Sequence, residues 1–160
     1  PMQPRAYVGT SDETFAIATG KYLWSAAQQG GLSTAGVLVN AGRAPQANDA
    51  AAKEAFAPLS VSLLPHGSDN SPWQPIIDAL PDLTGPVDAP SPKSVDVAAS
   101  TVKLFLPSFD KSQVKLTQYG PEVTVEAGDQ RHFISLPPAL YGLAVTGAKF
   151  QSGFLIISFG

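Results

Sequence analysis

The sequence predicts an incomplete α/β unit with a parallel sheet, followed by a small all-β sandwich. Two observations lead to this prediction. Up to about residue 80, apolar segments of strand length alternate with segments of helical periodicity, the order typical of a parallel sheet. After residue 94, apolar residues recur at every second position in short segments separated by turn residues, which is typical of an antiparallel sandwich.

The beginning of the chain predicts a β-α-β unit. Residues 5–10 are expected to form a strand, and Thr10 with Glu13 matches a capping box at the start of a helix. Gly30-Gly31 is expected to end that helix, because glycine adopts a left-handed backbone without steric cost. The apolar segment 36–40 predicts a second strand, buried on both faces and joined to the first by a parallel crossover.

The helix of this unit is expected to bury one face. Four of its residues recur at spacings of three and four, which indicates a single buried stripe. They are Phe15, Ala18, Tyr22 and Ala26. Trp24 lies on the same helix and is also expected to face a core.

A second unit of the same kind follows. Residues 48–56 predict a short alanine-rich helix capped by Asn48 or Asp49, and residues 57–64 predict a strand that ends at Pro65. Pro72 is expected in the first turn of a helix over 73–80, where proline is tolerated.

The α/β part is expected to be incomplete. A parallel sheet needs cover on both faces, and a doubly wound sheet usually has about five strands or more. Only three short helices are predicted here, so residues 1–84 are expected to form one flank of a larger domain. The first predicted strand lies so close to Pro1 that the chain is expected to be a cut fragment.

The predicted sandwich follows a Pro/Gly-rich linker at residues 85–93 and occupies residues 94–160. Six short strands are expected, each marked by alternating apolar residues. These are Val102-Leu104-Leu106, Val114-Leu116, Val123-Val125, Phe133 with Leu136, Val145, and Leu155-Ile157-Phe159. Such apolar residues are expected to face a core, although an exposed strand edge can also bind an unfolded segment.

Composition excludes several classes of function. The net charge of −3 argues against nucleic acids and anionic membranes as partners, because both require a basic surface. The chain has no cysteine, which excludes disulfides, thiol catalysis and cysteine-ligated metal sites. No apolar run approaches the roughly 18 residues of a membrane span, and no signal peptide is recognised. His66 and His132 are the only histidines, and neither has the neighbours of a metal site.

The segment from Leu106 resembles the α-crystallin, or small heat-shock, domain. Five motifs occur in the family's order: Leu106-Pro107-Ser108-Phe109, Val114-Lys115-Leu116, Glu122-Val123-Thr124-Val125, Phe133-Ile134-Ser135-Leu136-Pro137, and the segment 148–155 with Ala148, Gly153 and Leu155. Ser108 departs from the family, which has glycine in this turn. The Ile-x-Ile tail that joins small heat-shock oligomers is also missing.

The first half is similar to the last strands of the P-loop ATPase fold shared by ArsA and the tail-anchored-protein-targeting ATPases. The matching pieces are the strand-helix unit over 5–29, Val37-Leu38-Val39-Asn40, and the strand over 59–64 that runs into Pro65-His66. A cyanobacterial and plastid branch of that family carries a C-terminal α-crystallin-like domain, as here. The resemblance implies a cytoplasmic or stromal protein, ATP with Mg²⁺ in the complete protein, a homodimer or a missing N-terminal ATPase portion as partner, and a hydrophobic client.

The resemblance also implies a cofactor-binding site. Asn40 would contact the adenine edge, and Pro65 and His66 would lie against the base. From its position alone, Asn40 can equally cap a loop through its side chain. No G-x-x-x-x-G-K-[ST] phosphate loop is present, and Gly20-Lys21 lies inside a predicted helix. No catalytic residue is therefore predicted, the chain alone is not expected to hydrolyse ATP, and no cofactor is expected to bind it tightly.

Two other functions stay open. One is a stand-alone small heat-shock-like chaperone or protein-interaction module without nucleotide. The other is an ordinary hydrolase, although no G-x-S-x-G elbow or Ser/His/Asp set is recognised in the sequence.

Overall fold

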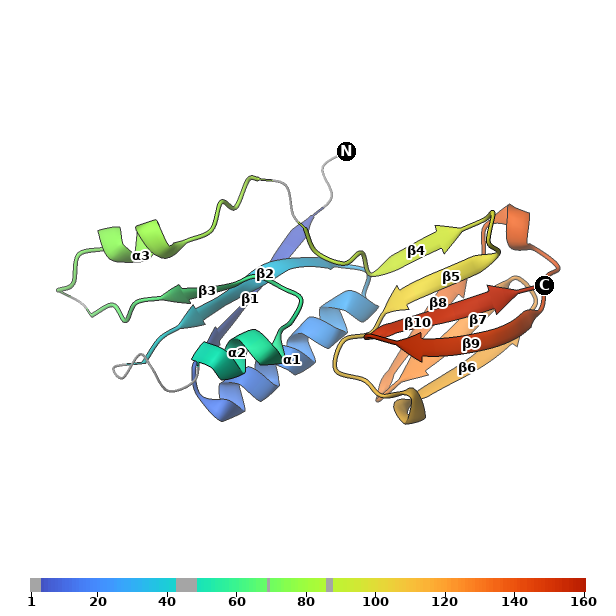
Figure 1. Cartoon of the computed structure of the whole chain (residues 1–160), viewed down its shortest axis with the longest axis horizontal. Helices are drawn as coiled ribbons and strands as arrows, with labels where there is room; N and C mark the ends of the chain where they lie inside the picture. Colours follow the sequence, from blue (N-terminus) through green and yellow to red (C-terminus); the bar gives the residue numbers. More distant parts are fainter. Residues whose placement is uncertain (1–3, 43–48, 69, 86–87) are drawn as a thin grey trace. The chain divides into compact units, whose positions relative to one another are not determined.

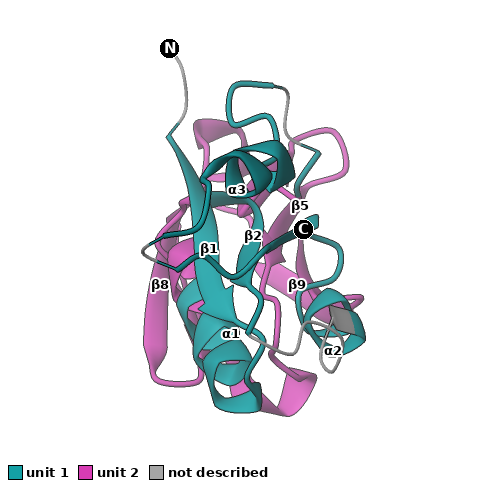
Figure 2. Ribbon diagram, turned by 90° about the vertical axis from the view of Figure 1, so that its left-hand side faces the viewer, with its two compact units in different colours: residues 1–24, 33–89 teal, residues 25–32, 90–160 magenta. Residues whose placement is uncertain are grey.

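The computed structural model describes residues 4–42, 49–68, 70–85 and 88–160. The chain divides into two compact units (Figure 2). The first comprises residues 1–24 and 33–89, and the second comprises residues 25–32 and 90–160. The boundary after residue 89 falls inside the predicted linker.

The first unit contains a three-stranded parallel sheet in the order β1-β2-β3 (Figure 1). The strands are β1 (Arg5–Ser11), β2 (Ser33–Asn40) and β3 (Val61–Leu64). Both pairings are parallel, with Val8 opposite Val37 and Val39 opposite Leu63. The predicted parallel crossover is confirmed. The third strand is shorter than the predicted segment 57–64.

Helices α2 (Asp49–Ala55) and α3 (Gln74–Ala79) belong to the first unit, whereas α1 (Thr14–Gln29) begins in the first unit and its residues from Ser25 onward are assigned to the second. The predicted capping box at the start of α1 is wrong, because Thr10 belongs to β1 and the helix begins only at Thr14. Pro75, not Pro72, lies in the first turn of α3, and Trp73 is its N-cap residue. Asn48 lies outside the described residues.

Helix α1 ends as predicted. Gly31 has a left-handed backbone with φ of 76°. The Gly31 amide donates to the Gln28 carbonyl at 3.0 Å, and the Leu32 amide donates to the Ala27 carbonyl at 2.9 Å. This pair of hydrogen bonds is a Schellman motif, which pairs carbonyls that the end of the helix leaves free.

The predicted buried face of α1 is wrong. Phe15 and Tyr22 are 83% and 54% exposed, and Ala18 is also exposed. The buried residues of the helix are instead Ile17, Gly20, Trp24, Ser25, Gln28 and Gln29. Gly20 allows the close approach that selects this face, because a Cβ at this position would lie 2.9 Å from Phe56 and 3.4 Å from Val8.

The two faces of the parallel sheet differ in burial. Val8, Val37 and Val39 lie on the face that meets α1 and are buried. On the opposite face, Tyr7 and Leu38 are only half-buried, and Gly9 is exposed. Among the described residues, the face that meets α1 is therefore the better covered of the two.

The second unit is a sandwich of two antiparallel sheets, which confirms the predicted all-β class. One sheet has the order β4-β5-β10-β9, and the other has the order β6-β7-β8. The strands are β4 (Lys93–Asp96), β5 (Thr101–Phe105), β6 (Val114–Tyr119), β7 (Glu122–Ala127), β8 (Gln130–Ser135), β9 (Val145–Gln151) and β10 (Phe154–Phe159). The short β4 was not predicted, because all four of its residues are exposed and only one of them is apolar.

The alternating residues of the strands fill the core of the sandwich. The buried cluster comprises Val102, Leu104, Leu106, Val123, Val125, Ala127, Ile134, Leu136, Leu140, Leu155, Ile157 and Phe159. Phe133 is not among them and is 68% exposed. Its prediction as a core residue is wrong, because its neighbour Ile134 has the inward position in β8.

Small residues with a positive φ form two turns of the second unit. Ser152 and Gly153 both have positive φ, 51° and 76°, between β9 and β10. Two successive positive values are the geometry of a tight hairpin, as predicted for Gly153. Ser108 also has positive φ, 70°, at the position where the resembling family has glycine.

Candidate functional site

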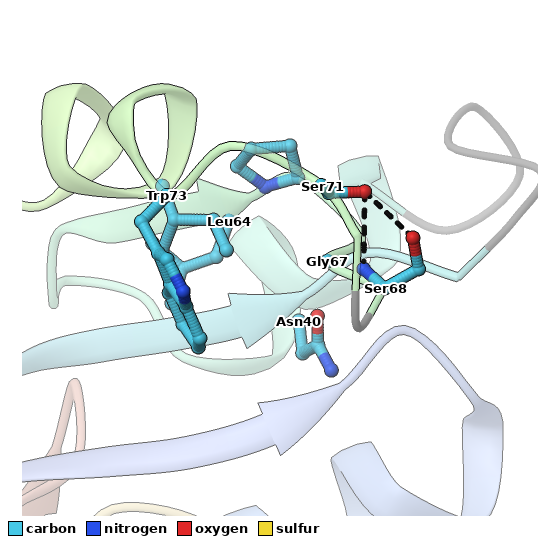
Figure 3. Close-up of a pocket in the computed structure, with 8 residues that line it drawn as sticks. Asn40, Leu64, Gly67, Ser68, Ser71 and Trp73 are labelled. Carbon is cyan, nitrogen blue, oxygen red and sulfur yellow. Dashed lines mark hydrogen bonds between the residues drawn. The ribbon is translucent and has the colours of Figure 1, made fainter.

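A cavity of about 280 Å³ opens at the carboxyl ends of β2 and β3 (Figure 3). Asn40 is the last residue of β2 and lies opposite Leu64, the last residue of β3. The Ala41 amide donates a hydrogen bond to the Leu64 carbonyl at 2.9 Å, which joins the strands just beyond their ends. Ligands of open parallel sheets bind at such carboxyl ends, so this cavity is the candidate site.

The polar part of the cavity comes from Asn40 and from the loop after β3. The Asn40 side chain is exposed and offers both a donor and an acceptor. The hydroxyls of Ser68 and Ser71 are 2.7 Å apart, and the Ser68 amide donates to the Ser71 hydroxyl at 3.2 Å. The Ser71 amide donates in turn to the Ser68 carbonyl at 2.8 Å. These hydrogen bonds hold the loop in a compact turn beside the cavity (Figure 3).

The apolar part of the cavity comes from Leu64, Pro65, Trp73 and Ile76. Trp73, one of the two tryptophans in the chain, is 72% exposed. Gly67 also lines the cavity, and a Cβ there would lie 3.0 Å from the Cδ1 atom of Ile76. A side chain at residue 67 would therefore crowd this wall.

The described residues that line the cavity are all uncharged. A cavity that is partly apolar, with a few hydrogen-bonding groups, suits a neutral planar molecule better than a phosphate group. Within the described ranges, no group of three histidine, aspartate or glutamate side chains is placed to hold a metal ion.

The structure brings together two of the three residues predicted for a cofactor. Asn40 and Pro65 both line the cavity, whereas His66 is exposed and does not line it. Sequence reasoning missed the other lining residues, which are Leu64, Gly67, Ser68, Ser71, Trp73 and Ile76. The sequence feature that could have pointed to these residues was the turn-forming pair Gly67-Ser68, shortly after the end of β3.

The second histidine lies in a different setting. His132, in β8, is half-buried. Burial lowers the pKa of His132, and the positive charge of Lys93 lowers that pKa further. Its imidazole is therefore harder to protonate than that of an exposed histidine.

The helices that the structure describes include none long and apolar enough to cross a membrane. Residues 98–159 match the family model of the HSP20-like domain found in ArsA. The C-terminal unit is thus an HSP20-like sandwich of the kind associated with ArsA. No curated protein matches the chain.

Proposed function

We propose that the first unit supplies part of the adenine pocket of an ArsA-like ATPase and that the second unit is its appended HSP20-like domain. The observation that carries this proposal is the cavity at the ends of β2 and β3, which Asn40 and Pro65 border and whose described lining residues are uncharged. It occurs in the same chain as an HSP20-like domain of a kind found in ArsA. Neither observation alone indicates a nucleotide.

The chemistry of the cavity agrees with adenine. The edge of adenine presents an amino donor beside a ring-nitrogen acceptor, and an asparagine amide can pair with both. Leu64, Pro65 and Ile76 offer apolar contacts for the faces of the base. The triphosphate requires backbone amides and a lysine of the phosphate-loop type, and this sequence contains no such loop. We assign those groups, and the residues that bind Mg²⁺, to another part of the ATPase.

The half-buried face of the sheet supports a larger α/β domain. Tyr7, Leu38 and Ser62 on this face are half-buried, and parallel sheets are normally covered on both faces. We assign this surface to the remainder of the ATPase domain. The homodimer, the hydrophobic client, and the cytoplasmic or stromal location belong to this same proposal.

Calorimetry with ATP tests the proposal, on this chain and on a longer chain that includes a phosphate loop. We expect tight binding only to the longer chain. Asn40→Ala in the longer chain should weaken binding about 5- to 30-fold, the loss of roughly 1–2 kcal/mol of hydrogen bonding. Asn70→Ala is the matched control, because Asn70 is exposed and does not line the cavity. Equal affinities of Asn40→Ala and the unmodified chain would contradict the proposal.

A second candidate function is a protein-interaction module that acts without nucleotide. Tyr119 and Phe133 are 73% and 68% exposed on the outer face of the β6-β7-β8 sheet, which gives this face apolar contacts for a partner. Suppression of the aggregation of a heat-denatured client by the full chain, without ATP, tests this function. Its loss in Phe133→Ser, but not in Asn40→Ala, would favour this candidate over the nucleotide site.

A further inference from the structure

Trp73 differs from the other tryptophan of the chain in its surroundings. Trp24 is 1% exposed, as expected for a large apolar side chain in a core, whereas Trp73 is 72% exposed. None of the residues of α3, which Trp73 precedes, is buried either. Packing within this unit therefore gives no account of an indole at this position.

The backbone of Trp73 is nevertheless fixed. Its carbonyl accepts hydrogen bonds from the amides of Ile76 and Ile77, each at 3.0 Å. The residue has an αR backbone as the N-cap of α3. The side chain thus starts from a defined point at the border of the cavity, next to Leu64 in Figure 3.

The position of the indole relative to Asn40 matters for a planar ligand. Both residues line the same cavity, Asn40 from the end of β2 and Trp73 from the loop that leads into α3 (Figure 3). An amide that pairs with the edge of a base leaves the two faces of that base free for apolar contacts. An aromatic side chain gains stacking energy from such a face, whichever groups pair with the edge.

We infer that Trp73 stacks on the base held by Asn40 and is a determinant of affinity at this site. This inference rests on the proposed function, because it assumes an adenine base in the cavity. It adds a residue from outside the two strands, and it gives a reason for an exposed indole at this position.

Titration of the full chain with adenosine tests the inference through two readouts, calorimetry and tryptophan fluorescence. Trp24 is buried, so quenching by acrylamide separates its emission from that of the exposed Trp73. We expect adenosine to change the emission of Trp73 and to protect it from acrylamide. Trp73→Leu should lose both effects and weaken binding about 5- to 100-fold, the range for one base–aromatic stack. Trp73→Phe, which keeps an aromatic ring, should retain most of the affinity.

Tyr141→Leu serves as the control, because Tyr141 is an exposed aromatic residue of the second unit. Circular dichroism checks that each variant stays folded, which we expect for substitutions at exposed positions. If the unmodified chain binds adenosine and Trp73→Leu binds it equally well, the inference is wrong and the proposed function stands. If the unmodified chain does not bind adenosine even at millimolar concentration, this cavity does not hold a base and the inference is wrong, whereas ATP binding by the longer chain and its Asn40→Ala variant still decides the proposed function.

Discussion

The rings of Trp24 and Phe56 lie 6.0 Å apart between centroids, with their planes inclined by 47°. Trp24 is 1% exposed and Phe56 is fully buried. Gly20 lies one turn before Trp24 on α1 and contacts the same phenyl ring, since a Cβ there would lie 2.9 Å from its Cζ atom. The contact between α1 and Phe56 therefore depends on the missing side chain of Gly20.

Gly20→Ala should lower the free energy of unfolding. Alanine favours a helix over glycine by about 1 kcal/mol, but overpacking a buried contact typically costs about 1–3 kcal/mol. Because Phe56 is fully buried, we expect the second effect to exceed the first. Urea denaturation measures the difference. Gly9→Ala in β1 is the control, because a Cβ there meets nothing within 4 Å. A Gly20→Ala variant more stable than the unmodified chain would show that Phe56 moves aside.

Ser108→Gly should raise the free energy of unfolding. The φ of Ser108 is 70°, and a left-handed backbone costs a residue with a Cβ about 1–2 kcal/mol. Glycine avoids most of this cost but loses more backbone entropy on folding, so we expect a net gain of about 0.5–1 kcal/mol. Thermal and urea denaturation measure it.

Ser94→Gly provides the opposite case for comparison. Ser94 lies in the extended strand β4 and is exposed. Glycine at a strand position should lower stability by about 0.5–1 kcal/mol. If both serine variants lose stability, the left-handed backbone of Ser108 is not the source of strain.

The period of the apolar residues explains why the sequence predicted the two sheet types. Alternation at every second residue requires one inward face per strand, so the core positions of β7 and β10 followed directly from Val123, Val125 and Ile157. In β8 the same argument chose the wrong core residue, Phe133 in place of Ile134. Both are apolar, and spacing alone does not choose between them.

The buried face of α1 was unpredictable for a related reason. The apolar residues of α1 lie on more than one face of the helix, so more than one stripe satisfies the spacing of three and four. The contact of Gly20 with Val8 and Phe56 selects the face, and that contact depends on residues distant in sequence.

The residues of the candidate site were also only partly predictable from the sequence. Asn40 and Pro65 were predicted from the family resemblance alone. Ser71 is held beside the cavity by its hydrogen bonds with Ser68, and Trp73 follows two residues later at the start of α3. No sequence period marks such a loop.

Protonation of His132 should destabilise the fold at mildly acidic pH. Burial, and secondly the charge of Lys93, lower its pKa below the usual value of 6.5. The unfolded chain then binds the proton more readily than the folded chain does, so stability rises with pH where the two forms differ. The contribution is complete above about pH 6.5 and is lost as pH falls through the lowered pKa of the folded state.

Urea denaturation between about pH 5 and pH 7.5 measures this dependence, which spans the unperturbed histidine pKa. His132→Gln should flatten the dependence in that window. An unchanged pH profile in His132→Gln would assign the dependence to other groups.

Gln118→Leu should destabilise the sandwich, because the side chain of Gln118 joins its two sheets. From β6, its Nε2 atom donates to the Leu143 carbonyl at 2.8 Å, and its Oε1 atom accepts from the Val145 amide of β9 at 2.8 Å. Leucine removes both hydrogen bonds, together with the 3.2 Å bond from Nε2 to the Gly120 carbonyl. The part-buried Leu143 carbonyl and Val145 amide are left unpaired, which costs about 1–3 kcal/mol. Urea denaturation should show a lower midpoint with an unchanged slope. Gln151→Leu in β9 is the matched control, since Gln151 is exposed. Equal stabilities of the two variants would mean that water replaces the Gln118 amide without cost, and the two sheets would then be held together by their apolar core alone.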